Sequence, residues 1–308
     1  MSDSTDNGTS KETGTGKLTR SKRFITGKRF RMTGLMVAPF GWVFLFTVLP
    51  MVIILLMSFW KVELFRVVHD WNLQNYLRTI QTLSFRRLLL RTFWNALIVG
   101  FMAVLLGYPL AYYITRIAKG NKIVFFILTL VPLWVSYLLR VYSWRVILGR
   151  NGLINSFLIW IGILKEPATI FLFNNFSVTL VLTYIALPFA FIPIYTSLEK
   201  IPQNLEEASK DLGAGNAKTF RKVIFPLSLP GVVTGGAYAL IIGFGDYITP
   251  NLVGGTNGYR LANAIEKWFG AANNWPFGSA QAVLLMIVIL IILSMVLLAG
   301  GVKAIIEE

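Results

Sequence analysis

Six long apolar segments, separated by shorter polar ones, dominate the pattern of this 308-residue chain. They lie near residues 35–59, 93–115, 123–145, 177–197, 229–249 and 280–302. At a rise of about 1.5 Å per residue, each segment is long enough to cross roughly 30 Å of hydrocarbon as a helix. The sequence therefore predicts an all-α fold, a polytopic membrane bundle of six transmembrane helices.

A polar segment from Pro202 to Pro226 separates the fourth and fifth apolar segments and predicts two short helices joined by a turn. Pro202 suits the first position of a helix, and Gly213 and Gly215 provide the break. A second helix is expected from about Asn216 until Pro226, which lacks a backbone donor. Apolar residues recur at helical spacing in each half: Leu205, Ala208 and Leu212, then Phe220, Val223 and Ile224. Such a hairpin either lies on the membrane surface or stands outside it and docks.

The composition excludes several classes of function. Hydrophobic residues make up 55% of the chain and charged residues only 14%, which is typical of a membrane protein. The net charge of +15 does not indicate nucleic-acid binding, because the basic residues gather beside apolar segments without interleaved aromatics. The chain has no Cys and a single His, His69, so redox chemistry and a metal site are not expected. We also expect no catalytic residues.

Charge along the chain predicts its domains and orientation. Residues 1–31 are rich in Ser, Thr and Gly and end in a basic cluster, so they predict a disordered basic cytosolic tail. Residues 32–308 are expected to form the membrane domain, with a cytosolic loop at 199–228. The link 116–122 and that loop carry several positive charges, as cytosolic segments do. The loop 61–91 is also basic although it is expected outside. Both termini are expected in the cytosol.

Two further stretches predict helices at the outer membrane surface. Residues 83–91 are apolar and basic at helical spacing, so we expect them to lie along the surface before the second span. The run 153–164 is apolar but too short to cross a bilayer, which indicates a short helix in or near the outer interface.

Charged and aromatic residues near the outer ends of the third and fifth spans predict a substrate pathway, because ionisable groups at membrane depth usually face the protein interior. The candidates are Asp246, Tyr247, Phe244, Trp134, Tyr137, Arg140, Tyr142, Glu266 and Trp268. Asp246 stands beside Gly245 and before Pro250, where water has access, and its carboxylate suits an ammonium group held with help from an aromatic ring. The alternative is that Asp246 pairs with an arginine and the aromatics form interface belts.

The order of residues in the polar hairpin resembles the EAA loop of permease subunits in ATP-binding-cassette importers. The family pattern Glu-Ala-Ala, Gly, then Ile, Leu, Pro is matched by Glu207-Ala208-Ser209, Gly213, and Val223, Phe225, Pro226, with three small or apolar replacements. The resemblance implies that the hairpin is the coupling helix, which fits a groove of a cytosolic ATPase subunit. The residues it assigns to coupling are Glu206, Glu207, Ala208, Ser209, Asp211, Leu212, Gly213, Ala214, Phe220, Val223 and Pro226.

Further runs resemble the first permease subunit of spermidine/putrescine importers, from about residue 35 onward. They are Gly107-Tyr108-Pro109-Leu110-Ala111, Arg140-Val141-Tyr142-Ser143-Trp144, Asn151-Gly152-Leu153-Ile154-Asn155, Asp211-Leu212-Gly213-Ala214 and Asn274-Trp275-Pro276-Phe277-Gly278. This resemblance implies the type I importer permease fold in a bacterial inner membrane. The implied partners are a second, related permease, two ATPase subunits that use ATP and Mg²⁺, and an extracytoplasmic polyamine-binding protein. The permease itself would bind no cofactor.

Three alternatives remain at this point. The substrate could be an opine or another organic amine of the same superfamily. An ion-coupled secondary carrier would favour ionisable residues at mid-membrane and inverted repeats, and neither is clear in the sequence. A membrane enzyme would need clustered His, Asp, Glu or Ser at one membrane face, which the scattered acidic residues do not provide.

Overall fold

The computed structural model describes residues 39–63, 66–118 and 120–299, and the chain divides into two units, residues 1–56 and 57–308. A helix begins at Pro39 in the first unit and ends at Met57, the first residue of the second. It contains the π-helical turn Phe44–Val48 followed by α2, Leu49–Met57. The first predicted span is thus confirmed for these residues. The tail predicted for residues 1–31 lies outside the described residues.

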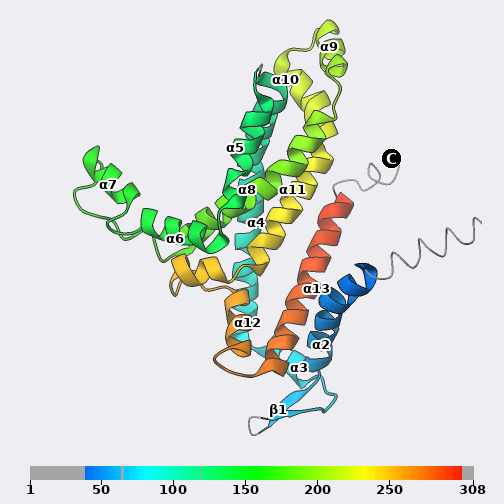
Figure 1. The fold of residues 1–308 in the computed structure, drawn as a ribbon, viewed down its shortest axis with the longest axis vertical. Coiled ribbons are helices and arrows are strands. Elements are labelled where there is room, and N and C mark those ends of the chain that lie inside the picture. The colour runs from blue at the N-terminus through cyan, green and yellow to red at the C-terminus, as the bar shows by residue number, and fades with distance from the viewer. Residues whose placement is uncertain (1–38, 64–65, 119, 300–308) are drawn as a thin grey trace, which may run out of the picture. The chain divides into compact units, whose positions relative to one another are not determined.

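Three long helices form the centre of the second unit: α4 (Leu83–Tyr112, extended by the π-helical turn Tyr113–Ile117), α8 (Asn175–Glu199) and α11 (Phe225–Gly245) (Figure 1). Small residues let their backbones approach closely. A Cβ atom added at Gly235 of α11 would lie 2.5 Å from the carbonyl oxygen of Ala190 in α8. One added at Gly243 would lie 2.8 Å from the Cα atom of Ala96 in α4. The second, fourth and fifth predicted spans are therefore confirmed as helices of membrane length.

A second layer packs against this centre at one end. It consists of α12 (Leu261–Phe269) and α13 (Trp275–Ala299), and the π-helical turn Pro250–Gly254 precedes it. Helix α13 confirms the sixth predicted span as far as residue 299, and the remainder of that prediction lies outside the described residues. Buried apolar side chains join these helices to α4 and α11: Phe85, Ala96, Leu240, Phe244, Leu261 and Leu285.

The third predicted span is not one straight helix, which corrects the prediction for residues 123–145. The chain forms α5 (Lys122–Trp134), α6 (Tyr137–Ile147) and then α7 (Leu153–Trp160), with a bend of 92° after α5. Pro132 lacks a backbone N–H donor and Ser136 has a non-helical conformation, and α5 ends between them at Trp134. The described residues thus contain five membrane-length helices, or six if the bent pair counts as one span.

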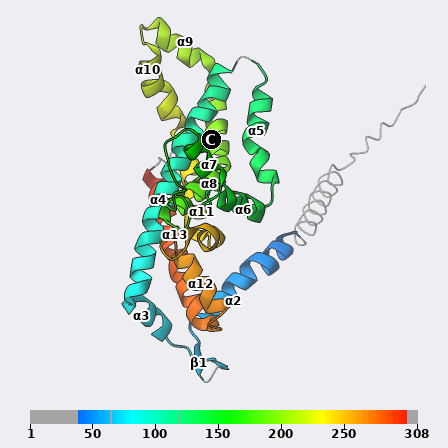
Figure 2. The same cartoon turned by 90° about the vertical axis from the view of Figure 1, so that its left-hand side faces the viewer.

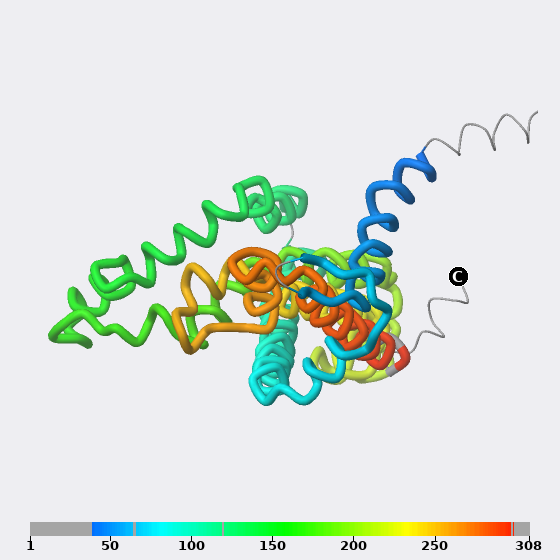
Figure 3. Tube along the Cα trace, turned by 90° about the horizontal axis from the view of Figure 1, so that it is seen from below, coloured from blue at the N-terminus to red at the C-terminus, as the bar shows by residue number. Residues whose placement is uncertain are grey.

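Helix α6 leads outward beside the turn Pro250–Gly254, although its Val141 and the following Leu148 are buried in the core, and α7 lies at the far end of this arm (Figure 3). The short helix expected in residues 153–164 is confirmed as α7. Residues 83–91 do not lie along the surface, however. They are the first turns of α4, because the chain leaves the helical conformation at Thr82 and then continues without a break into the span.

A small ordered structure precedes α4. Strands β1 (Lys61–Glu63) and β2 (Arg66–Val68) pair antiparallel, and α3 (Gln74–Gln81) follows. The Asn75 amide donates hydrogen bonds to the carbonyls of Ser58 and Trp60, which ties α3 to the start of the strand pair. This pair was not predicted from the sequence.

The polar hairpin consists of α9 (Gln203–Asp211) and α10 (Asn216–Thr219), which continues through the π-helical turn Phe220–Ile224 into α11. The predicted break and the start near Asn216 are confirmed. Pro202 precedes α9 instead of opening it, and the second helix does not end at Pro226. The wider π-helical turn, in which Phe225 donates to the Phe220 carbonyl, allows the helix to pass the proline.

Candidate functional site

The hairpin of α9 and α10 stands at one end of the second unit, and the strand pair and α3 stand at the other (Figures 1 and 2). Its turn depends on Gly213, whose φ of +78° lies in the region that L-residues with a side chain rarely adopt. Beside it, the Leu212 side chain is 88% exposed. The tip therefore presents an apolar side chain on a fixed backbone turn.

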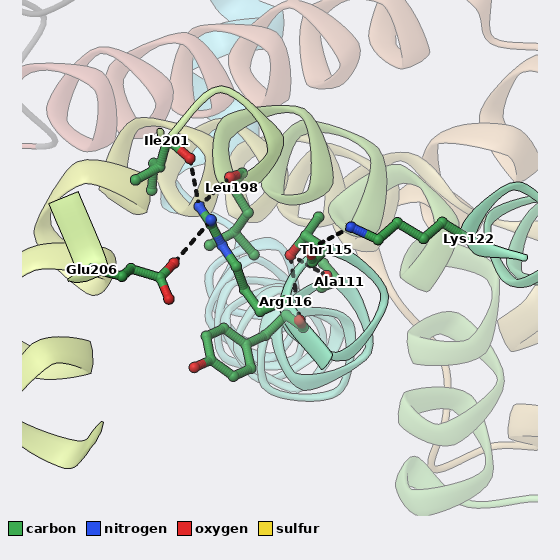
Figure 4. Close-up of polar contacts among 8 residues, drawn as sticks. Ala111, Thr115, Arg116, Lys122, Leu198, Ile201 and Glu206 are labelled. Carbon is green, nitrogen blue, oxygen red and sulfur yellow. Dashed lines mark hydrogen bonds and ion pairs between the residues drawn. The ribbon is translucent and has the colours of Figure 1, made fainter. Parts of the chain in front are cut away.

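Arg116, at the end of the helix that begins with α4, holds the hairpin in place (Figure 4). One guanidinium nitrogen, Nη1, lies 2.8 Å from Oε1 of Glu206 in α9. The other, Nη2, donates to the carbonyls of Leu198 and Ile201 at 2.8 Å each. One cation thus connects α4, the end of α8 and the start of α9.

Two more contacts fix the second helix of the hairpin. Phe220 packs edge-on against the rings of Tyr108 and Tyr112 in α4, with centroids 5.8 and 5.6 Å apart. The hydroxyls of Ser209 and Thr219 lie 3.1 Å apart and join α9 to α10. The hairpin is thus connected by side-chain contacts to α4 and α8 and continues directly into α11, the three helices that form the bundle centre.

The predicted coupling residues fall into two groups in the structure. An exposed group is Glu207, Ala208, Asp211, Leu212, Gly213 and Pro226. A group turned partly inward is Glu206, Ser209, Ala214, Phe220 and Val223. The first group can contact another protein, while the second holds the hairpin on the bundle. Sequence reasoning missed Arg116 as the anchor; the available signal was a cation in the last turn of a membrane helix.

A second candidate site surrounds Asp246, where α11 ends. Its Oδ1 atom accepts hydrogen bonds from the backbone N–H groups of Ile248 and Thr249, at 2.8 and 3.2 Å. Its Oδ2 atom accepts from the Thr249 hydroxyl at 2.5 Å and from the Tyr137 hydroxyl of α6. The carboxylate is thus held at the C-terminal end of α11, where it contacts α6.

Asp246 lines a cavity of about 410 Å³ together with Tyr137, Arg140 and Tyr247. The ion pairs among the described residues are Arg116 with Glu206 and Lys61 with two acids, so Asp246 has no arginine partner. Instead, the Arg140 guanidinium lies 5.7 Å from the Tyr137 ring centroid. The alternative that Asp246 pairs with an arginine is therefore wrong for this structure.

The other predicted pathway residues do not join this cavity. Phe244 is fully buried against Phe93 in the apolar core, so it is a packing residue. Trp268 packs edge-on against Phe277, with centroids 4.7 Å apart. Glu266 lines a neighbouring groove of about 670 Å³ between the end of α11, α12 and α13, which shares Gly245 and Tyr247 with the Asp246 cavity.

Trp134 and Tyr142 are 76% and 48% exposed and line no cavity that contains Asp246. The positions of these residues along the predicted spans indicate similar depths in the membrane, but they do not show which way each side chain points. Thr249, which binds the Asp246 carboxylate, was missed; its position three residues after Asp246 was the available signal. Among the residues that the structure describes, no group of three acidic or imidazole side chains is placed to hold a metal.

Comparison with known proteins gives consistent matches over most of the chain. Residues 39–305 match the family described as binding-protein-dependent transport system inner membrane component. The spermidine/putrescine transport system permease protein PotB of Escherichia coli K12 is 34% identical over 249 residues, which cover 80% of this chain and 90% of that protein. The inner membrane ABC transporter permease protein YdcU of the same strain is 34% identical over 229 residues, covering 70% of this chain and 72% of that protein.

The fold is also similar to that of a solved structure. A chain in the crystal structure of a bacterial ABC transporter involved in the import of the acidic polysaccharide alginate superposes with a TM-score of 0.67 at 16% identity. The match covers 91% of this chain and 98% of that chain. At this identity the likeness establishes the fold, which is that of a type I importer permease.

Proposed function

Because the chain belongs to the family of binding-protein-dependent transport system inner membrane components, we propose that it is one of two permease subunits of an ATP-driven polyamine importer. The family makes the chain a transport component of the inner membrane. The substrate class is supported by the 34% identity to the spermidine/putrescine permease over 80% of the chain. The single observation that carries the mechanism is the anchored hairpin of α9 and α10.

We propose that this hairpin docks on a cytosolic ATPase subunit. The exposed Leu212 enters an apolar groove of the partner, and the exposed carboxylates beside it meet polar groups at the rim. When ATP closes the ATPase pair, the hairpin moves as a rigid lever, because Arg116 and Phe220 tie it to α4. The central helices then tilt, and the cavity between two permeases opens to the opposite side of the membrane. Two separate ATPase subunits supply the hydrolysis, and this chain binds no nucleotide.

The Asp246 cavity has the chemistry to hold a passing polyamine. Polyamines carry protonated amines, and an oriented carboxylate attracts an ammonium group strongly where water is scarce. The ring of Tyr247 adds cation-π attraction, whereas the Tyr137 ring already lies against the Arg140 guanidinium. The existing hydrogen bonds from Tyr137 and Thr249 keep the carboxylate oriented while they leave its charge available. A weak, shared site of this kind suits transport, because the substrate must also leave.

The remaining partners follow from this assignment. We propose a related second permease that completes the pathway, and an extracytoplasmic binding protein that delivers the polyamine to the end opposite the hairpin. In this arrangement both termini of the chain lie in the cytosol.

Uptake of radiolabelled spermidine and putrescine tests the proposal. The chain is produced with its neighbouring permease, ATPase and binding protein in cells that lack their own polyamine uptake. Uptake is expected with the complete set and should vanish when the ATPase carries a substitution that blocks hydrolysis. Uptake that survives this substitution and follows a proton or sodium gradient would contradict the proposal.

A further inference from the structure

Arg91, in the third turn of α4, and Arg260, just before α12, have no acidic partner among the residues that the structure describes. Arg260, at the start of α12, is only 2% exposed, and its Nη1 donates to Asn175 Oδ1 at 3.1 Å. Arg91 Nη1 donates to the Asn257 carbonyl at 3.2 Å. Neither arginine belongs to an ion pair among the described residues. A buried cation of this kind is costly unless an anion compensates it.

The electrostatics agree with an uncompensated pair. Burial, and secondly the neighbouring charge of Arg91, lower the pKa of Arg260 to about 10. Arg260 therefore remains protonated at neutral pH. Its Nε atom is buried and has no hydrogen-bond partner. The charge is thus present, enclosed and incompletely satisfied.

A cavity of about 490 Å³ adjoins this pair and offers donors for an anion. Its polar lining residues are Arg91, Asn174, Asn175 and Asn257. The Asn174 amide already donates to the carbonyls of Ile170 and Leu172, so it is not a free donor. Because Arg260 engages the Oδ1 atom of Asn175, the amide N–H₂ group of that side chain is available as a donor. The polar lining contains no carboxylate, so it favours an oxyanion over a cation.

The surroundings indicate where the anion comes from. Leu90 and Trp94, on either side of Arg91 in α4, are 59% and 62% exposed. Phe176 and Ile170, which line the cavity itself, are 56% and 67% exposed. Exposed apolar and aromatic groups beside a basic pocket are typical of contact with lipid.

The level of the cavity along the membrane normal also agrees with a lipid headgroup as its ligand. Helix α8 has 25 residues, or about 37 Å at 1.5 Å per residue, and crosses a hydrocarbon core of roughly 30 Å. Its C-terminal end meets the hairpin, so its N-terminal end, where Asn174 and Asn175 lie, reaches the headgroup level of the opposite leaflet. We propose that the cavity lined by Arg91 and Asn175, with the buried charge of Arg260 beside it, binds the phosphate group of an anionic phospholipid in the leaflet opposite the hairpin.

Native mass spectrometry on the full-length chain, purified in detergent with its co-purifying subunits, tests this site. Phosphatidylglycerol and phosphatidylcholine are titrated separately and their adducts are counted. Arg91→Gln removes the exposed charge but keeps a donor for Asn257, and it spares the buried Arg260, whose loss would endanger folding. We expect Arg91→Gln to weaken phosphatidylglycerol binding about fivefold, because a phosphate in the cavity loses the charged side chain that lines it.

Arg87→Gln is the matched control, since Arg87 lies one turn earlier on α4 and is exposed but does not line the cavity. It should leave phosphatidylglycerol binding unchanged, and phosphatidylcholine binding should not respond to either substitution. Equal losses in both variants, or no loss in Arg91→Gln, would overturn the site. Inorganic phosphate is titrated alone as a third arm. If Arg91→Gln weakens phosphate binding but leaves lipid adducts unchanged, the lipid assignment is wrong.

Discussion

The Arg116 guanidinium and the Glu206 carboxylate form an ion pair that is largely shielded from water, with 7% and 16% of the two side chains exposed. Removing one partner of such a pair leaves an uncompensated charge and costs about 3–5 kcal/mol. Arg116→Ala should be more severe than a substitution of Glu206, because it also removes the hydrogen bonds to the carbonyls of Leu198 and Ile201. The unfolding temperature of the purified transporter and the rate of spermidine uptake should both fall.

The neighbouring carboxylate provides the matched control for this prediction. Glu206→Gln should lower both stability and uptake, whereas Glu207→Gln should lower uptake and leave the unfolding temperature unchanged, because Glu207 is exposed. If the two glutamine variants behave alike in both measurements, the division between anchoring and docking residues is wrong.

The turn of the hairpin depends on Gly213, with φ of +78°, and not on Gly215, with φ of −69°. A Cβ atom at Gly213 meets no other atom, so its substitution tests backbone conformation alone. We expect Gly213→Ala to strain the turn by about 1–2 kcal/mol and to reduce uptake while the chain still inserts into the membrane. Gly215→Ala should transport normally. Equal uptake in both variants would show that the left-handed turn is not required.

Adjacent glycines of α11 make a second matched pair. A Cβ atom at Gly235 would lie 2.5 Å from the Ala190 carbonyl oxygen, whereas one at Gly236 would meet its nearest atom, in Val104, at 3.5 Å. Gly235→Ala should therefore push α11 away from α8 and cost about 1–3 kcal/mol of stability, and Gly236→Ala should be nearly neutral. For each variant, the yield of folded protein is measured after detergent extraction and again after heating. A neutral Gly235→Ala would argue against the close helix contact.

The Asp246 site predicts an effect on substrate affinity. Asp246→Asn keeps the shape and one acceptor oxygen, replaces the other by an N–H₂ donor and removes the charge. The KM for spermidine uptake should therefore rise about tenfold, with the maximal rate less affected. Glu266→Gln is the control, because Glu266 lines a different groove. If the KM responds to Glu266→Gln but not to Asp246→Asn, the cation pathway lies in the groove of α12 and α13.

The sequence predicts the number and approximate position of the membrane helices because apolar length is sufficient to identify a span. It also predicts the hairpin, since Gly213 and the polar segment are local signals. The break after Trp134 was missed, because residues on both sides of it are apolar and hydropathy does not register a bend. The direction in which a side chain points is harder still to predict from the sequence. Phe244 and Asp246 are two residues apart, yet one is buried in the core and the other lines a cavity, and only helix packing decides between them.

The central claim is that the tip of the hairpin contacts an ATPase in the cytosol. Because the chain has no cysteine, a single introduced thiol reports without background. Leu212→Cys, at a position 88% exposed in the hairpin, is compared with Trp71→Cys, at a position 67% exposed beyond the strand pair at the opposite end. Each is treated with a short bifunctional cross-linker in the assembled transporter. The account predicts that Leu212→Cys links to the ATPase subunit and Trp71→Cys does not; a link from Trp71→Cys with none from Leu212→Cys would contradict it.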